Sequence, residues 1–221
     1  MPVITDIRPA ARHAGRVDVD VDGKRCATLT LDAADRLALR QGRDLAEPDL
    51  LALSEESSAL LTYDRAQNML ASRARSARDL RRHLLRKGEA ERFVDSAIER
   101  LLALGYLDDA EFARQFTRIK STSSGFSIRR VQTELARRGV AREIADAAIR
   151  EVTADESIDE SAALERIARK QLHLLRSADE PTRWRRLYSF LARRGYSPDD
   201  IRRVMAQLLS ASDAEEHEST V

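Results

Sequence analysis

Two neighbouring carboxylates, Asp108 and Asp109, are the residues whose types and spacing come nearest to catalytic chemistry in this sequence. A carboxylate pair can bind a metal ion or divide acid and base roles. Here both follow Gly105-Tyr106-Leu107 and precede an apolar helical pattern, with Glu111 three residues after Asp108. Aspartate at a helix start is most often a cap, and an acid three residues later completes a capping box. We therefore interpret this pair as a helix start rather than as a catalytic site.

Other catalytic signatures are missing from the sequence. It contains no glycine-rich phosphate loop, no His-Glu-x-x-His and no Gly-x-Ser-x-Gly. A single cysteine, Cys26, excludes an intrachain disulfide and a cysteine metal cluster. The histidines lack the spacing of metal ligands: His13, His83, His173 and His217. We therefore expect no enzyme activity, no cofactor and no bound metal.

The remaining chemical signal is positive charge, which recurs on three short segments that end in Gly88, Gly139 and Gly195. Guanidinium groups bind phosphate and carboxylate through paired hydrogen bonds. A repeated basic helix would form a positive groove suited to a nucleic-acid backbone or an acidic protein filament, although a charge run is also what a solvated helix face shows. The candidate binding residues are Arg78, Arg81, Arg82, Arg86, Lys87, Arg129, Arg130, Arg137, Arg138, Arg185, Arg186, Arg193 and Arg194.

Composition sets the broad class of the protein. The chain has 221 residues, of which 43% are apolar and 34% are charged, against a usual charged share of ~25%. The net charge of +1 means that any attraction for nucleic acid must come from local segregation of charge. The N-terminus lacks the pattern of a signal peptide, and no run of ~20 apolar residues is present. We therefore expect a cytoplasmic protein.

Residues 1–57 are predicted to form a small module of a β-hairpin and short helices. Three valines alternate with aspartates before Asp22-Gly23, a dipeptide typical of a two-residue hairpin turn, and Val3 to Ile7 can add a third strand. A hairpin alone is marginal in water, so we expect it to pack on the leucine-rich segment 32–53. The small polar residues at 54–58 mark the boundary to the rest of the chain.

The segments that end in the three glycines share one pattern. Counting back from each glycine, an apolar residue lies eight positions before it, a leucine lies four before it and two basic residues lie directly before it. The four-residue apolar spacing indicates a helix face, basic residues suit the negative end of a helix dipole, and glycine ends the helix. Because another helical pattern precedes and follows each segment, we predict a three-helix unit repeated every ~50 residues.

The predicted fold is mainly α, with three tandem three-helix repeats in an elongated, curved array behind the N-terminal module. The repeats span residues 58–106, 107–153 and 158–210, and residues 211–221 form a disordered acidic tail. We expect a monomer. Aromatic residues at helical spacing are assigned to the cores rather than to a stacking platform for bases: Tyr106, Phe112, Phe116, Trp184, Tyr188 and Phe190.

The motifs of the first two repeats resemble those of the bacterial RecX regulatory proteins. Residues 105–113 read Gly-Tyr-Leu-Asp-Asp-x-x-Phe-Ala, and residues 128–140 read Ile-Arg-Arg-Val-x-x-Glu-Leu-x-x-Arg-Gly-Val. Upstream, residues 76–88 read Ser-x-x-Asp-Leu-x-x-x-Leu-x-x-Lys-Gly. The likeness is best over residues 60–152. The third repeat resembles the family's looser C-terminal repeat, and the hairpin agrees with an extension found in many members.

The resemblance implies a non-enzymatic modulator of the RecA recombinase. Such proteins bind along the groove of the RecA filament on single-stranded DNA and limit its growth, which restrains strand exchange, ATP hydrolysis and the repressor autocleavage of the SOS response. The resemblance thus implies RecA and single-stranded DNA as partners. A hypothesis from another class is a free-standing nucleic-acid-binding array with no recombinase partner. The second hypothesis predicts tight binding to DNA alone, with an affinity that falls steeply as salt rises.

Overall fold

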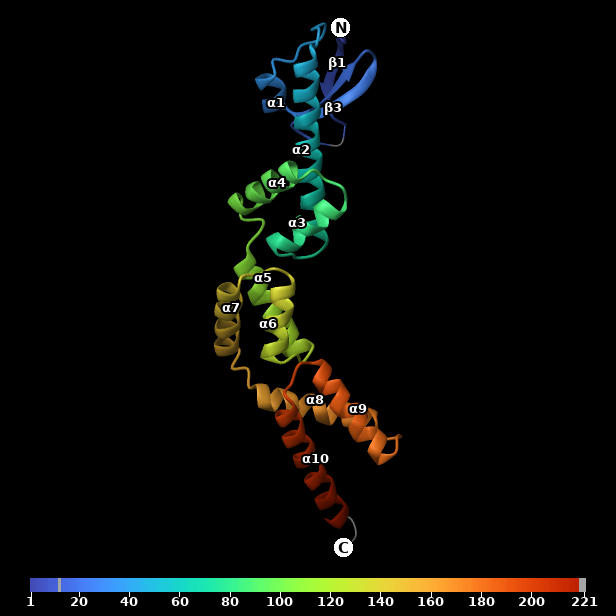
Figure 1. Ribbon diagram of the computed structural model, residues 1–221, viewed down its shortest axis with the longest axis vertical. Helices are drawn as coiled ribbons and strands as arrows, with labels where there is room; N and C mark the ends of the chain where they lie inside the picture. The colour runs from blue at the N-terminus through green and yellow to red at the C-terminus, as the bar shows by residue number, and fades with distance from the viewer. Residues whose placement is uncertain (12, 219–221) are drawn as a thin grey trace. The chain divides into compact units, whose positions relative to one another are not determined.

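The computed structural model describes the backbone of residues 1–11 and 13–218, and the side chains of that part as far as residue 208. The chain divides into two compact units, Met1–Leu107 and Asp108–Val221. Apart from three strands near the N-terminus, the regular structure of the described residues is helical (Figure 1). The fold is therefore mainly α with a small N-terminal sheet, as the sequence predicts.

The N-terminal sheet has three antiparallel strands in the order β1-β2-β3: β1 (Ile4–Pro9), β2 (Arg16–Val21) and β3 (Lys24–Thr30). The turn between β2 and β3 contains Asp22 and Gly23, which have φ angles of 50° and 77°. Two successive positive φ angles match the right-handed twist of a hairpin, which explains the Asp-Gly dipeptide. The predicted hairpin and its third strand are both confirmed.

Two helices pack with the sheet: α1 (Leu31–Arg36) and α2 (Glu47–Ser72). Thr30, the last residue of β3, caps α1 by accepting a hydrogen bond from the amide of Ala33. The apolar faces of the sheet and the helices pack together in one core. This packing buries the face that an isolated hairpin would leave exposed to water. Its most buried members are Ile4, Val19, Leu29, Leu45 and Leu53.

Helix α2 crosses the boundary expected at residues 57–58 without a break, so that expectation is corrected. Its N-terminal part buries Leu53 in the core with the sheet, whereas its C-terminal part buries Tyr63 in the core of the following helices. Arg16 of β2 also holds Asp64 of α2 by two hydrogen bonds, of 2.5 and 2.6 Å. Anchoring at both ends keeps the helix continuous, and this outweighs the weaker helix propensity of the serines.

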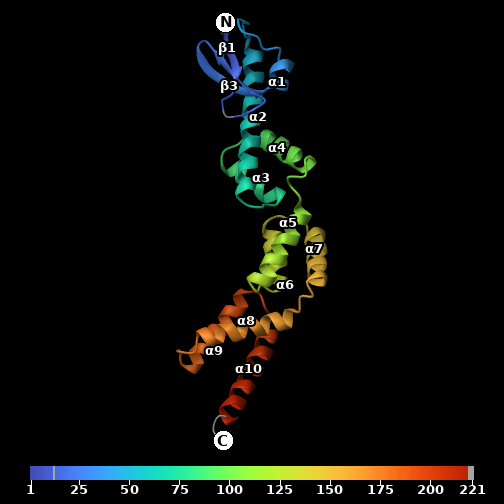
Figure 2. The same ribbon diagram turned by 180° about the vertical axis from the view of Figure 1, so that it is seen from behind.

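Three helices follow one another three times along the chain (Figures 1 and 2). The first domain combines the end of α2 with α3 (Ala77–Arg86) and α4 (Glu91–Ala103). The second contains α5 (Asp109–Arg118), the π-helix η1 (Ile119–Ser123), α6 (Ile128–Arg137) and α7 (Arg142–Asp155). The third contains α8 (Glu160–Leu174), α9 (Glu180–Arg193) and α10 (Pro198–Glu218). Each domain has its own apolar core.

The middle helix of each domain ends at a glycine with a positive φ angle, 86° at Gly88, 81° at Gly139 and 91° at Gly195. At Gly88 the next amide, of Glu89, donates to the carbonyl of Leu84, and the Gly88 amide donates to the carbonyl of Leu85. This pair of bonds is the Schellman motif, which satisfies carbonyls that the last turn leaves open. The predicted helix stops are confirmed.

The second and third domains meet along a seam formed by residues 124–128 and 194–195. The amide of Ser127 donates to the carbonyl of Arg194 at 3.0 Å, and Nε of Arg194 donates to the carbonyl of Ser124 at 3.1 Å. A Cβ added to Gly195 would lie 2.5 Å from Cβ of Arg130 and 2.7 Å from Oγ of Ser127. Gly195 therefore ends a helix and also lets the third domain approach the second closely.

Helix α10 extends to Glu218. Residues 211–218, expected to be part of a disordered tail, therefore belong to this helix, and residues 219–221 lie outside the described residues. An acidic composition favours disorder, but a helix that is already nucleated adds further residues at little cost.

Gly88 and Gly195 allow the seam to be tested with matched substitutions. Both have a strongly positive φ, but nothing lies within 4 Å of a Cβ added at Gly88. We expect Gly88→Ala to lower the free energy of unfolding by about 1 kcal/mol, from backbone strain alone. Gly195→Ala should cost more, since Arg130 or Ser127 must also move. Thermal melts of both variants give the comparison.

Hydrogen exchange provides the control for this prediction. In Gly195→Ala the Ser127 amide should exchange faster, while the amides of the first domain stay as protected as in the parent protein. Equal losses of stability in the two variants, with an unchanged Ser127 amide, would contradict a tight seam.

Candidate functional site

The predicted basic residues lie on α3, α6 and α9 or at the C-cap position directly after each of them, before the glycines. Counting back ten, six and two residues from each glycine gives a row of side chains on the helix side away from the buried leucines. We call these nine residues the outer stripe, and all of them are exposed: Arg78, Arg82 and Arg86 on α3, Arg129, Thr133 and Arg137 on α6, and Arg185, Ser189 and Arg193 on α9. An arginine thus occupies the first and last stripe positions in every domain.

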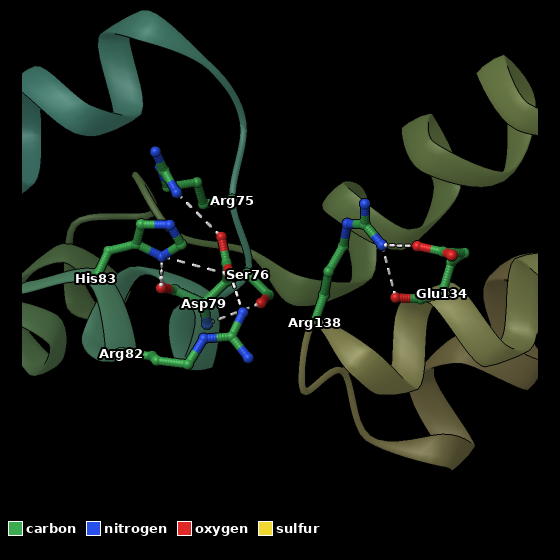
Figure 3. A network of polar contacts seen from close by, with 7 residues as sticks. All are labelled: Arg75, Ser76, Asp79, Arg82, His83, Glu134 and Arg138. Atoms are coloured by element: carbon green, nitrogen blue, oxygen red, sulfur yellow. Dashed lines mark hydrogen bonds and ion pairs between the residues drawn. The ribbon is translucent and has the colours of Figure 1, made fainter. Parts of the chain in front are cut away.

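On α3, much of the positive charge is balanced by carboxylates of the same domain. Asp79 accepts hydrogen bonds from Arg82 at 2.5 Å and from Arg75 at 3.1 Å, as the left side of Figure 3 shows. The Asp79 amide donates to Ser76 Oγ, and its carbonyl lies 2.7 Å from Nδ1 of His83. Asp79 therefore organises the start of α3 as well as its charge.

These contacts shift the pKa values of Asp79 and Arg81. Burial tends to raise the pKa of Asp79, but its bonds to Arg82 and Arg75 and the nearby His83 lower the pKa overall. Hydrogen bonds to Asp95 and Glu91 of α4 raise the pKa of Arg81 above its ordinary value. Both residues are held in their charged forms, and Arg81 is committed to contacts inside its own domain.

On α6, one carboxylate serves three arginines. Glu134 lies 2.8 Å from Arg130 and 3.5 Å from Arg137, and it accepts a 2.6 Å hydrogen bond from Arg138. Arg138 also donates to the Glu134 carbonyl, as the right side of Figure 3 shows. The hydrogen bond from Arg138 is the main reason why the pKa of Glu134 lies below its ordinary value. These guanidinium groups are therefore partly neutralised.

On α9, no carboxylate takes the corresponding place. The position that His83 and Glu134 hold in the earlier domains is Phe190, and no acid occurs between Glu180 and Asp199. The guanidinium of Arg194 lies 3.7 Å from the centre of the Phe190 ring, and its burial lowers its pKa. The positive charge of α9 is therefore the least balanced of the three.

The thirteen predicted binding residues divide into two groups. One group is exposed and makes no ion pair within the described part of the chain: Arg78, Arg86, Lys87, Arg129, Arg185, Arg186 and Arg193. The other group makes contacts inside its own unit: Arg81, Arg82, Arg130, Arg137, Arg138 and Arg194. The sequence pattern places all thirteen residues in three equivalent segments, but it does not show which of them make contacts inside their own unit.

The aromatic prediction is wrong for two residues. Tyr106 is 64% exposed and Tyr188 is 36% exposed, whereas Phe112, Phe116, Trp184 and Phe190 pack against the cores as expected. Tyr106 follows a Gly105 stop at which Leu107 takes the buried place, and Tyr188 comes one residue after the buried Leu187, which turns it away from the core. Helical spacing of apolar residues alone therefore does not identify which tyrosines are exposed.

The adjacent carboxylates Asp108 and Asp109 lie at the start of α5. Asp108 caps α5 by accepting hydrogen bonds from the amides of Ala110 and Glu111 at 2.8 and 2.9 Å. Glu111 turns its carboxylate to Arg114 and Gln115 of its own helix, so the predicted capping box is only half formed. Among the described residues no three His, Cys, Asp or Glu side chains are grouped to hold a metal ion.

Glu89 follows Gly88 at a position that Val140 and Tyr196 occupy after the later glycines. Its side chain is largely buried against α2, where it accepts a 2.7 Å hydrogen bond from Thr62 and pairs with Arg65. The first domain therefore closes onto α2 with a polar contact where the other two use an apolar side chain. None of the described helices has the length and apolar character to cross a membrane.

Comparison with known proteins finds the same three-domain organisation. The family models for the first, second and third three-helix domains of RecX match residues 63–101, 108–149 and 159–205. The regulatory protein RecX of Amycolatopsis mediterranei is 40% identical over 129 residues, covering 58% of this chain and 72% of that relative. The RecX of Prosthecochloris aestuarii is 30% identical over 155 residues, covering 70% and 98%, and that of Geobacillus kaustophilus is 28% identical over 225 residues, covering 99% and 82%.

Solved structures agree at the level of the fold. A crystal structure of a regulatory protein RecX aligns with a TM-score of 0.68 at 19% identity, covering 93% of this chain and all of the other. The crystal structure of RecX from Lactobacillus salivarius aligns with a TM-score of 0.53 at 18% identity, covering 68% of this chain and 96% of that one.

The Asp79 network predicts how stability depends on pH. Because the pKa of Asp79 is lowered by folding, its stabilising effect is complete above the unfolded value of about 3.9 and is lost as pH falls through the folded value. Asp79→Asn should therefore lower the melting temperature at neutral pH, and the difference from the parent protein should narrow below pH ~4. Thermal melts across this pH range measure it.

Asp35→Asn is the control, since Asp35 is exposed on α1 and makes no ion pair within the described part of the chain. It should melt like the parent protein at every pH. A constant difference between Asp79→Asn and the parent down to the lowest pH would show that the charge of Asp79 does not stabilise the fold.

Proposed function

The chain belongs to the family of RecX regulatory proteins, and on that premise we propose that it binds the filament formed by RecA on single-stranded DNA and restrains its activity. Binding limits filament growth, and it therefore reduces strand exchange, ATP hydrolysis and the coprotease activity that induces the SOS response. The protein acts by occupying a surface and catalyses no step of its own.

The observation that carries this proposal is the outer stripe. Arginines occupy its first and last positions in all three domains, and each is held there by a glycine helix stop. A surface repeated at one register suits a partner that is itself a repeating polymer, because each domain can make the same contact with a successive subunit. Linked contacts of this kind raise the overall affinity well above that of one domain.

Charge balance favours a nucleoprotein filament over bare DNA as the main partner of the first two domains. The arginines around Asp79 and Glu134 are already paired with carboxylates, which weakens their attraction for a polyanion but leaves donors for protein carboxylates. A surface that carries both arginines and carboxylates can match the charges of a protein partner, and such matching makes binding between proteins specific.

The second candidate, a nucleic-acid-binding array with no recombinase partner, is favoured by α9 alone. Its exposed Arg185, Arg186 and Arg193 make no ion pair within the described part of the chain, as a phosphate-binding surface requires. The two candidates differ in whether RecA must be present for binding and for effect.

Charge reversal on the stripe tests the proposal. Arg78→Glu combined with Arg129→Glu changes the same exposed stripe position in the first and second domains. We expect about tenfold more protein to be needed for half-inhibition of the DNA-dependent ATPase of RecA, a loss of ~1.4 kcal/mol in binding. Melting should be unchanged, since neither arginine makes an ion pair in the part of the chain that the structure describes.

Arg142→Glu combined with Arg150→Glu is the matched control, because it makes the same change in net charge on exposed positions of α7, outside the stripe. The control should inhibit RecA like the parent protein. If both double variants lose inhibition equally, net charge rather than the stripe determines binding, and an ATPase that is insensitive to excess parent protein would exclude the RecA proposal.

Salt dependence separates the two candidates. For the parent protein alone on single-stranded DNA, a regulator of the filament should bind weakly at physiological salt, whereas its binding to RecA-coated DNA should remain tight. A free-standing DNA-binding protein would bind bare DNA at least as tightly, with an affinity that falls steeply with salt. Fluorescence anisotropy with a labelled oligonucleotide, with and without RecA, distinguishes these outcomes.

A further inference from the structure

One side of α9 combines exposed cations with an exposed aromatic ring. The residues that share this side are all exposed, and we call them the α9 outer face: Arg185, Arg186, Tyr188, Ser189, Ala192 and Arg193. The opposite side of the helix buries Leu187 and Leu191 completely in the third core. The outer face therefore stands on a packed helix rather than on a loop.

The charge of this face sets it apart from its counterparts. On α6 the carboxylate of Glu134 faces three arginines, and on α3 the carboxylate of Asp79 faces two. Asp179 caps the start of α9, where hydrogen bonds from Thr182 and, to a smaller degree, the charge of Arg185 lower the pKa of its carboxyl. The sequence holds no acid between Glu180 and Asp199, and the outer face lies within that stretch. The face is therefore complementary to a polyanion.

Tyr188 is flanked by small side chains. Ser189 is next to it in the chain and Ala192 lies one turn further on, so neither can cover the phenol ring, while Arg185 lies one turn before it. The equivalent position is Arg81 on α3 and Gln132 on α6, so the ring occurs only in the third domain. An exposed ring with arginines before and after it combines the two features that proteins use to bind single-stranded nucleic acid, an aromatic surface for stacking and positive charge for the backbone.

The helix that carries the α9 outer face is held by contacts with its surroundings. Arg194 donates to the carbonyl of Ser124 and lies over Phe190, which ties the end of α9 to the seam with the second domain. At the other end Asp179 caps the helix, and Nε1 of Trp184 donates to Glu180 at 3.4 Å. Because the end of α9 is tied to the seam and Leu187 and Leu191 are buried in the third core, a ligand on the outer face would lose little free energy to ordering of the protein.

We propose that the α9 outer face is a binding site for single-stranded nucleic acid, in which a base stacks on Tyr188 and Arg185, Arg186 and Arg193 contact the flanking phosphates. This inference extends the proposed function, since it assigns the DNA contact of the regulator to the third domain and leaves the filament protein to the other two. Stacking on one ring is tolerant of sequence, so the site selects single-stranded over double-stranded nucleic acid and does not select particular bases.

The test compares two oligonucleotides of equal length and charge, oligo(dT) and its abasic analogue, with the full chain in fluorescence anisotropy. The parent protein should bind oligo(dT) about tenfold more tightly, because only oligo(dT) can stack. Tyr188→Ala should remove this preference, and Tyr188→Phe should keep it. Tyr106→Ala is the matched control, since Tyr106 is an exposed tyrosine outside the basic face, and it should retain the preference.

Each other outcome overturns the proposal. Equal affinity of the parent protein for both oligonucleotides means contact with the backbone alone, and this comparison needs no variant to fold. Loss of the preference in Tyr106→Ala with its retention in Tyr188→Ala places the stacking elsewhere, and no measurable binding of either oligonucleotide removes the site.

The phosphate contacts have their own test. Arg185→Glu with Arg193→Glu should weaken the binding of both oligonucleotides alike and reduce the salt dependence, and unchanged binding would contradict their role. Inhibition of the RecA ATPase by the parent protein, measured in parallel, separates the two proposals. Inhibition without a preference for oligo(dT) over its abasic analogue would support the regulator and exclude this site. A preference for oligo(dT) without inhibition would support the site and exclude the RecA role.

Discussion

A glycine with a positive φ ends α3, α6 and α9, and the orientation of every basic residue on these helices depends on it. In the first two domains the glycine and the residue after it donate to carbonyls of the last turn, Gly88 to Leu85 and Gly139 to Ala136. These bonds fix where the helix ends relative to the leucine four residues earlier, which is fully buried. Since a helix is rigid, fixing the stop and the buried leucine also fixes which side chains face outward. The outer stripe is a consequence of this constraint.

The three stripes share a register but differ in electrostatics, and the difference comes from one position on each helix. The residue five before the glycine is His83, Glu134 or Phe190. Glu134 draws three arginines toward itself, whereas Phe190 offers the guanidinium of Arg194 only a ring face. In α3 the acid is Asp79, one turn earlier than Glu134 in the repeat, and it neutralises a different pair. The three domains therefore share the positions of their outward-facing residues. The residue types near those positions determine how much of the positive charge of each domain is left without an acidic partner.

Local rules account for what could be predicted from the sequence. Helix stops at glycine, the Asp22-Gly23 turn and the Asp108 cap depend on residues close in the chain, and all were correct. The continuity of α2 could not be predicted, because it results from two separate cores that bury Leu53 and Tyr63. For the candidate site, sequence located the basic helices, but the ion pairs of Arg81 and Arg130 depend on side-chain conformations and on neighbouring helices. Tyr188 was misassigned because apolar spacing does not distinguish adjacent helix faces when both carry large side chains.

The seam connects the helix stop of the third domain with the helix start of the second. At Gly195 the stop that orients α9 is also the point where the third domain touches Ser127 and Arg130 of the second. Ser127 is at the same time the N-cap of α6, accepting a hydrogen bond from the Arg130 amide. One small cluster of backbone contacts therefore sets the start of α6 and the end of α9 together, so these two helices cannot turn independently about their axes. A partner that binds one of them meets the other in a defined orientation. The proposed binding of protein by α6 and of nucleic acid by α9 on one filament requires such an orientation.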